Sequence, residues 1–263
     1  MSMSDKYFAG LDMGSAFTKA VVTCNKKMMA SAVSPSGGNY LNAARRVLDE
    51  SLSQAGIGFE NLAGIVATGL GAGNCAFEAR KVSDLSCQAM GCFCLFPSAR
   101  TIIDIGGQFT KAARINPEGR LLDFLISEKC ATGSGRFLQI IARILQINIE
   151  DIGPLSLKSQ TPVEFSTNCA VFAESEAISR IAEGAAKEDI LAGVHRAMAS
   201  KVSMLVKRLK MEPDIVMSGG SSQDAGLVAT VAQAVGMEIL VPEKPMITAA
   251  LGAACLAEDE PDI

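Results

Sequence analysis

Two copies of one short motif decide the fold that this sequence predicts. The first copy is Asp12-Met13-Gly14-Ser15-Ala16-Phe17-Thr18-Lys19-Ala20, and the second, 92 positions later, is Asp104-Ile105-Gly106-Gly107-Gln108-Phe109-Thr110-Lys111-Ala112. Six of the nine aligned residues are identical. Two copies indicate a duplicated lobe, because a solenoid requires at least about three repeats. Strand-like and helix-like segments alternate around both copies, so we expect an α/β fold with two related lobes, residues 1–98 and 99–263.

Each copy of the motif is typical of a phosphate-binding turn. A strand that ends in Asp-x-Gly and enters a turn of small residues directs backbone N–H groups at one point, and the carboxylate can hold Mg²⁺ beside bound phosphates. A single such turn is more often an ordinary hairpin. Two copies favour a nucleotide triphosphate held from both sides. The candidate catalytic carboxylates are Asp12 and Asp104, and the candidate nucleotide-binding residues of the two turns are Gly14, Ser15, Ala16, Thr18, Lys19, Gly106, Gly107 and Gln108.

A third turn of this kind follows a short apolar strand at Ser218-Gly219-Gly220. Paired glycines allow the backbone to approach a ligand closely, which suits an α-phosphate or a ribose edge. We therefore add Gly219 and Gly220 to the candidate nucleotide-binding residues. The sequence contains neither a Walker loop nor a Gly-x-Gly-x-x-Gly fingerprint, which argues against P-loop and Rossmann proteins.

Composition excludes several other classes of protein. The formal charge of −4 in 263 residues gives no basic footprint for nucleic acid. The N-terminus has no apolar signal core, and the longest apolar runs are too short to span a bilayer. Eight cysteines without an export signal indicate a reducing, cytoplasmic location. The single histidine, His195, excludes a multi-histidine metal site, and we interpret it as a structural residue.

Two cysteines, Cys130 and Cys169, lie in small polar segments just ahead of helix-like runs, and they are 39 positions apart. A helix N-terminus favours the thiolate form. Two interpretations stay open: inert buried thiols, or half of a four-thiolate [4Fe–4S] site that a second chain completes. A rival group, Cys87, Cys92 and Cys94, occupies an apolar stretch, and its spacing misses the plant ferredoxin pattern by one residue, so we expect core packing there.

These residues together resemble a known family. The resemblance is carried by Leu11-Asp12-Met13-Gly14-Ser15, Ala67-Thr68-Gly69, residues 102–108, Lys129-Cys130-Ala131-Thr132-Gly133-Ser134-Gly135-Arg136-Phe137-Leu138, Cys169-Ala170-Val171-Phe172-Ala173-Glu174-Ser175-Glu176 and Gly219-Gly220. They are similar to the activators of 2-hydroxyacyl-CoA dehydratases and to the ATP-hydrolysing subunits of benzoyl-CoA reductase. The match runs from Phe8 to about Ala257, and the cysteine motifs are its specific part.

The resemblance implies an acetate-kinase, sugar-kinase, Hsp70 and actin-like fold of two lobes, with ATP and Mg²⁺ in the cleft. It adds Gly133 and Gly135 to the cofactor-binding residues. It also implies a homodimer, or a heterodimer of paralogous subunits, in which Cys130 and Cys169 of both chains bridge one [4Fe–4S] cluster. Ferredoxin or flavodoxin then donates an electron, and ATP hydrolysis drives it at low potential to a dehydratase or reductase component. No nucleic acid or membrane partner is implied.

The sequence departs from the family pattern at three positions. Phe109 stands where the family usually has Asp, Asp224 where it often has Asn, and Ala249 where it has Gly. Because Phe109 matches Phe17 in the first copy, we expect it to be a core residue. Two rival functions remain: an amino-sugar kinase of the same fold without a cluster, and a non-catalytic nucleotide-binding scaffold.

Overall fold

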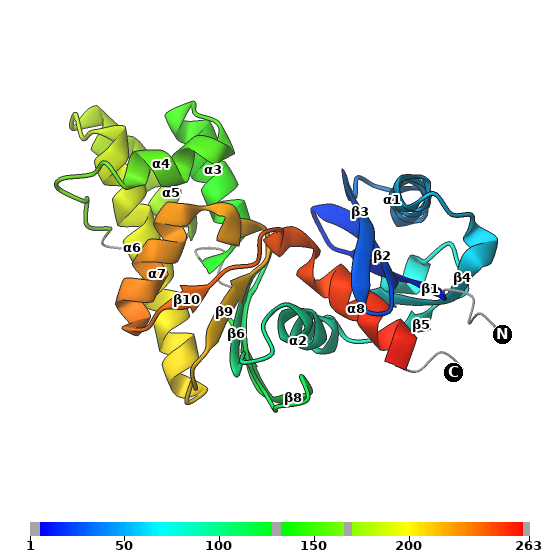
Figure 1. Ribbon diagram of the computed structural model, residues 1–263. Coiled ribbons are helices and arrows are strands. Elements are labelled where there is room, and N and C mark those ends of the chain that lie inside the picture. The colour runs from blue at the N-terminus through cyan, green and yellow to red at the C-terminus, as the bar shows by residue number, and fades with distance from the viewer. Residues whose placement is uncertain (1–5, 128–132, 166–169, 260–263) are drawn as a thin grey trace. The chain divides into compact units, whose positions relative to one another are not determined.

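The computed structural model describes residues 6–127, 133–165 and 170–259, which form two units (Figure 1). The first unit comprises residues 1–99, 115–122 and 242–263, and the second comprises residues 100–114 and 123–241. Each unit is built around one five-stranded sheet, although Ile115, Leu121 and Leu122 of the second sheet group with the first unit.

The first unit has the strand order β3-β2-β1-β4-β5. Strands β1, β2 and β3 are antiparallel neighbours, whereas β4 and β5 run parallel to β1. Its elements are β1 (Tyr7–Met13), β2 (Phe17–Cys24), β3 (Lys27–Pro35), α1 (Tyr40–Ala55), η1 (Phe59–Asn61), β4 (Leu62–Thr68), η2 (Ala72–Asn74), β5 (Arg80–Lys81), α2 (Asp84–Leu95), η6 (Pro245–Ile247) and α8 (Thr248–Asp259).

The second unit repeats this plan with the order β8-β7-β6-β9-β10, so each strand of the first sheet has a counterpart in the second. Its elements are β6 (Thr101–Ile105), β7 (Thr110–Ile115), β8 (Leu121–Ile126), α3 (Gly135–Leu145), η4 (Ile149–Asp151), α4 (Ile152–Ser156), α5 (Ala170–Ala182), α6 (Lys187–Arg208), β9 (Ile215–Ser218), η5 (Gly220–Gln223), α7 (Ala225–Val235) and β10 (Ile239–Leu240). The duplication that the two motifs predict is thus present in the topology of both sheets.

Helices cover both faces of the first sheet. Side chains alternate along β1, so neighbouring residues of this strand pack against different helices. Ala9 and Leu11 pack with Val47 and Leu48 of α1, whereas Phe8 packs in a separate cluster with alanines of α8. Local signals set the bounds of α1, since Asn39 accepts a hydrogen bond from the backbone N–H of Asn42 (3.0 Å) and Gly56 ends the helix at φ +69°.

The division into units differs from the predicted boundary at residues 98 and 99 in two segments. Residues 115–122 and 242–263 group with the first unit, not with the second. Helix α8 packs against α2 and against β1, β2 and β4. It is apolar on most sides, with Ala250, Ala253 and Ala254 fully buried, so it covers the open face of the first sheet. Within the described residues, no helix is both long and apolar enough to cross a membrane.

Candidate functional site

The first motif forms a tight turn between β1 and β2. Asp12 lies near the end of β1, and its Oδ2 is 2.7 Å from Nζ of Lys19 on β2. The backbone N–H of Gly14 donates to the carbonyl of Phe17 at 3.1 Å, which closes the turn. Thr18 is buried, and its hydroxyl lies 2.9 Å from Oγ of Ser36, which donates to the Gly14 carbonyl at 2.6 Å. These hydrogen bonds hold the base of the turn, while Ala16 at its tip is exposed.

The second motif has the same geometry between β6 and β7. Oδ2 of Asp104 lies 3.7 Å from Nζ of Lys111, and the N–H of Gly106 donates to the carbonyl of Phe109 at 3.0 Å. Gln108 is exposed at the tip of the turn. Phe109 is 41% exposed, so the prediction that it is a core residue is wrong. Its side chain stands at the accessible tip, whereas the strand residues on either side of the turn supply the core.

A glycine after the fourth strand of each unit lies against the aspartate of the same unit. Gly219, which follows β9, has φ +88°, and a Cβ there would lie 2.5 Å from Oδ1 of Asp104. Gly69, which follows β4, has φ +86°, and a Cβ there would lie 2.7 Å from Oδ1 of Asp12. Sequence reasoning selected Gly219 but missed Gly69 as its counterpart. Both glycines directly follow a strand that ends in a hydroxyl residue, Thr68 or Ser218, and this shared order in the sequence could have identified Gly69.

The second turn is hydrogen-bonded to both ends of the segment that carries Cys130. At the first end, the N–H of Ser127 donates to the carbonyl of Thr110 at 2.8 Å, and the N–H of Thr110 donates to Oγ of Ser127 at 3.0 Å. At the other end, the Thr110 hydroxyl donates to the carbonyl of Gly133, and the N–H of Gly135 donates to the carbonyl of Gly106 at 2.9 Å. Gly133 and Gly135, both predicted cofactor-binding residues, thus lie beside this turn.

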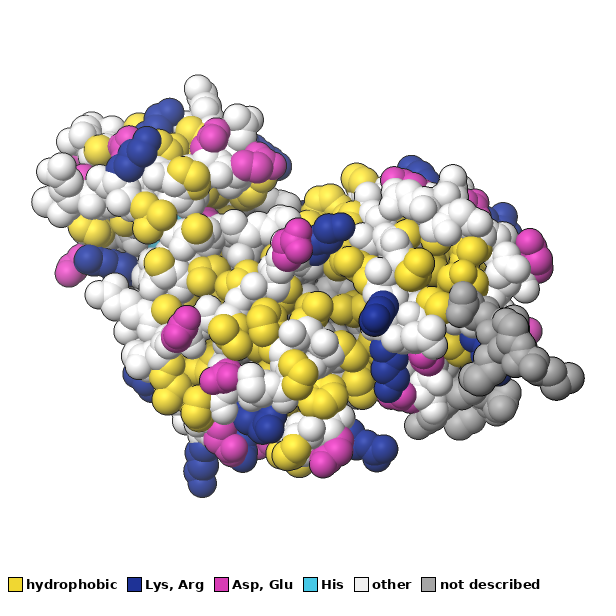
Figure 2. Space-filling model, viewed as in Figure 1, with side chains coloured by type: hydrophobic (Ala, Val, Ile, Leu, Met, Phe, Trp, Pro, Cys, Tyr) yellow, Lys and Arg dark blue, Asp and Glu magenta, His cyan; other side chains and the backbone are white. Residues whose placement is uncertain are grey.

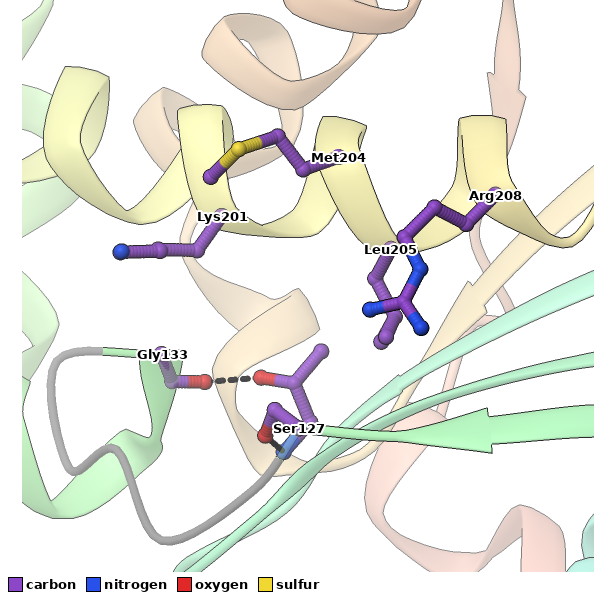
Figure 3. A pocket seen from close by; sticks show the side chains of 7 residues that line it. Ser127, Gly133, Lys201, Met204, Leu205 and Arg208 are labelled. Atoms are coloured by element: carbon purple, nitrogen blue, oxygen red, sulfur yellow. Dashed lines mark hydrogen bonds between the residues drawn. The ribbon is translucent and has the colours of Figure 1, made fainter.

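A pocket of about 270 Å³ opens between this turn and α6 (Figure 3). Thr110, Ser127 and Gly133 line one side. Figure 3 shows Lys201, Leu205 and Arg208 extending from α6 on the opposite side, and Met204 completes the lining. Among the described residues that line the pocket, the charged side chains are those of Lys201 and Arg208, and both are cationic.

Cys130 and Cys169 lie outside the described residues, but the helices that follow them are described. Helix α3 starts five residues after Cys130, and α5 starts directly after Cys169. These two helices pack against each other, and Phe137 and Ile141 of α3 share a core cluster with Ala173 and Ala177 of α5. In the described part of the chain, no group of three or more His, Cys, Asp or Glu residues is arranged to hold a metal ion.

The other candidate side chains lie away from both turns or within the core. Cys87 and Cys92 are fully buried, as the core interpretation predicts, and burial raises the pKa of the Cys87 thiol to about 12. Cys94 is half-buried. His195 is fully buried on α6, and its Nε2 lies 3.0 Å from Oδ2 of Asp224. Asp224 also caps α7, because its Oδ1 accepts from the N–H of Leu227 at 2.9 Å.

The two groups of predicted nucleotide-binding residues belong to different units. Asp12, Gly14, Ser15, Ala16, Thr18 and Lys19 come together in the first unit, and Asp104, Gly106, Gly107, Gln108, Gly133, Gly135, Gly219 and Gly220 belong to the second. Hydrophobic side chains reach the surface in both units (Figure 2). On α5 they include Phe172, which is 66% exposed, and Ile178, which is 53% exposed.

Comparison with known proteins gives extensive matches. The model of the BadF/BadG/BcrA/BcrD ATPase family matches residues 9–257. The 2-hydroxyisocaproyl-CoA dehydratase activator of Clostridioides difficile is 41% identical over 254 residues, covering 97% of this chain and 96% of the relative. One of the subunits of benzoyl-CoA reductase from Thauera aromatica is 32% identical over 185 residues, covering 70% of this chain and 65% of the relative. The predicted resemblance is confirmed.

Solved structures agree with these relatives. The activator of the 2-hydroxyisocaproyl-CoA dehydratase from Clostridium difficile, with bound ADPNP, has a TM-score of 0.92 and 42% sequence identity, covering 97% of this chain and 95% of that one. A ROK family glucokinase from Streptomyces griseus has a TM-score of 0.61 at 11% identity, covering 96% and 99% of the two chains, and this likeness concerns the fold alone. The predicted actin-like ATPase fold is confirmed.

Proposed function

Because this chain belongs to the BadF/BadG/BcrA/BcrD ATPase family, we propose that it is an ATP-hydrolysing activator that delivers a low-potential electron to a partner enzyme. The partner is a 2-hydroxyacyl-CoA dehydratase or a benzoyl-CoA-reductase-type component, and ferredoxin or flavodoxin is the electron donor. The relatives that share nearly the full length of this chain support the choice of a dehydratase activator.

The two units act as the two lobes of the ATPase in this proposal. The duplicated turns fit a nucleotide, since each unit places a carboxylate and a lysine ammonium beside a turn whose tip is accessible. The glycines at 69 and 219 leave room that a Cβ would fill beside Asp12 and Asp104. Asp12 and Asp104 would hold Mg²⁺ or the water it carries, which neutralises charge on the phosphates during transfer. Gly219 and Gly220 would lie along the α-phosphate or ribose.

Cys130 and Cys169 are the proposed ligands of a [4Fe–4S] cluster that two copies of the chain share. Two thiolates from each chain give the four ligands that such a cluster needs, and a two-fold axis brings them together. The packing of α3 against α5 supports this, because each helix directly follows one of the two cysteine segments. The exposed Phe172 and Ile178 on α5 suit a surface that a second copy covers. The cluster supplies the one-electron carrier.

One observation carries the coupling between ATP and electron transfer. The turn after Asp104 is hydrogen-bonded, through Thr110 and Gly106, to residues on both sides of the Cys130 segment. Any movement of this turn with the state of the phosphates therefore reaches the ends of that segment directly. A γ-phosphate that orders a turn, and whose hydrolysis releases it, is a known form of switch.

The test is strictly anaerobic purification followed by iron analysis, EPR spectroscopy and light scattering. We expect about four iron atoms per dimer, and an EPR signal of the reduced protein that changes when ADPNP is added. Cys130→Ala should abolish iron binding and leave ADPNP binding intact, and Cys75→Ala is the matched control that should retain both. Protein that carries no iron after reconstitution would overturn the cluster. Phosphoryl transfer to glucosamine-type sugars would instead identify a kinase.

A further inference from the structure

The duplication extends to a pair of helices that the nucleotide motifs do not include. The segment Ala89-Met90-Gly91-Cys92-Phe93-Cys94-Leu95 of α2 returns 161 positions later as Ala250-Leu251-Gly252-Ala253-Ala254-Cys255-Leu256 of α8. Four of the seven aligned residues are identical: alanine, glycine, cysteine and leucine. Each helix follows the fifth strand of its half of the chain. Cys94 and Cys255 are therefore equivalent residues of the two copies.

The two equivalent helices pack in unusually close contact at their shared glycine. A Cβ on Gly91 would collide with the carbonyl of Thr248, and a Cβ on Gly252 would collide with the carbonyl of Cys87. Only glycine permits such an approach of two backbones. The two glycines also meet each other, because a Cβ on Gly252 would lie 2.5 Å from the backbone nitrogen of Gly91. Three positions beyond each glycine stand Cys94 and Cys255, whose Sγ atoms lie 3.2 Å apart.

The two thiols differ in accessibility and acidity. Cys94 is half-buried, whereas Cys255 is fully buried. The hydrogen bond with Cys255 lowers the pKa of the Cys94 thiol, and the Lys26 ammonium acts in the same direction against the effect of burial. Lys26 is held nearby by an ion pair with Asp259 and by a backbone hydrogen bond to Glu258 at 2.8 Å. Cys94 is thus the better nucleophile, and Cys255 is placed to react second.

We propose that Cys94 and Cys255 form an oxidisable dithiol site, separate from Cys130 and Cys169 and beyond the proposed function, that reacts with small-molecule disulfides. Cys94 loses its proton to solvent, and its thiolate attacks one sulfur of the small disulfide, forms a mixed disulfide and releases one thiolate, which takes up a proton from solvent. The Cys255 sulfur then attacks Sγ of Cys94, a Cys94–Cys255 disulfide forms, and the second small thiolate leaves and takes up the Cys255 proton. The protein dithiol is oxidised, and the small disulfide is reduced to two thiols.

The product would link two helices that already touch. Because α2 and α8 lie within the first unit, the link closes a chain loop that passes through the whole second unit. Cross-linking residues so far apart in sequence restricts the unfolded chain strongly. The oxidised protein should therefore unfold at a temperature several degrees above that of the reduced protein.

The experiment treats the anaerobically purified full chain with glutathione disulfide, alkylates the remaining thiols and maps the products by non-reducing proteolysis and tandem mass spectrometry. We expect a peptide pair joined through Cys94 and Cys255 that dithiothreitol separates. Cys255→Ala should stop the reaction at a glutathione adduct on Cys94, and Cys94→Ala should give neither product. Cys92→Ala is the control and should leave the cross-link unchanged.

Two results would overturn the proposal: a wild-type protein whose Cys94 carries glutathione without forming the cross-link, or one in which both thiols remain reduced while other cysteines react. Thermal unfolding of the oxidised and reduced wild type is a second measurement that needs no variant. An unchanged unfolding temperature in cross-linked protein would contradict the argument that the disulfide restricts the unfolded chain. Neither readout depends on iron or on ATP hydrolysis, so failure here is distinguishable from failure of the proposed function.

Discussion

Replacing Gly219 with alanine should destabilise the second unit and weaken nucleotide binding, because no side chain fits at this turn. The backbone has φ +88° and ψ 168°, a region that costs a non-glycine residue about 1–3 kcal/mol. The new Cβ would also lie 2.5 Å from Oδ1 of Asp104 and 2.7 Å from the carbonyl oxygen of Ile105. Overpacking of this kind costs about 1–3 kcal/mol. The two terms together give about 2–6 kcal/mol.

Gly236 provides the matched control for this substitution. It lies in the same unit at φ +77°, but nothing lies within 4 Å of a Cβ placed there. Gly236→Ala should therefore cost only about 1 kcal/mol, from the left-handed backbone alone. Urea unfolding followed by far-UV circular dichroism measures both costs, and calorimetric titration with ADPNP measures binding. We expect affinity to fall about tenfold or more for Gly219→Ala and to stay unchanged for Gly236→Ala. Equal losses of stability in the two variants would refute the role assigned to the contact with Asp104.

Three further predictions follow from the same geometry. Asp104→Asn should lower the rate of phosphate release from ATP by about 100-fold or more while the far-UV spectrum stays unchanged, and a near-normal rate would remove Asp104 from the reaction. Thr110→Val should preserve iron but abolish the effect of ADPNP on the EPR signal, whereas its counterpart Thr18→Val, whose hydroxyl is hydrogen-bonded to Ser36 of the first unit, should preserve that effect. Because burial raises the pKa of Cys87 to about 12 from the ordinary 9.0, the stability that its neutral thiol contributes is complete below pH 9.0 and is lost as the pH rises toward 12. Between pH 8 and pH 10 the wild type should therefore lose about 1 kcal/mol more than Cys87→Ala in urea unfolding, and parallel losses would contradict the burial effect.

Much of the fold was predictable because its signals are local. The repeated Asp-x-Gly motif specifies a strand, a tight turn and a second strand within nine residues, and both copies form that structure with the same closing hydrogen bond. The helix over residues 40–55 was predictable for the same reason, since its apolar spacing and its terminal Gly56 lie within one short segment. The duplication then predicted that the halves share a topology, which the two strand orders confirm.

The candidate site was only partly predictable. Gly69 and Gly219 meet their aspartates from another strand, and the residues flanking the Cys130 segment meet the second turn through hydrogen bonds from Thr110. In each of these contacts the two partners are distant in sequence, so no local sequence pattern predicts the contact. Phe109 is the opposite case. Its match with Phe17 in the first copy predicted a core residue, but its position at the tip of the turn exposes it.

The sequence by itself determined the duplication, the phosphate-type turns and the family, because each depends on residue types at fixed short spacings. Only the tertiary structure decided that the final helix α8 belongs with the first unit, that His195 is paired with Asp224, and that Cys94 lies against Cys255. The physical reason is the same in each case. Which distant segments come together depends on how apolar faces and close-packing glycines are buried against one another, and that burial is a property of the folded chain rather than of any short stretch of it.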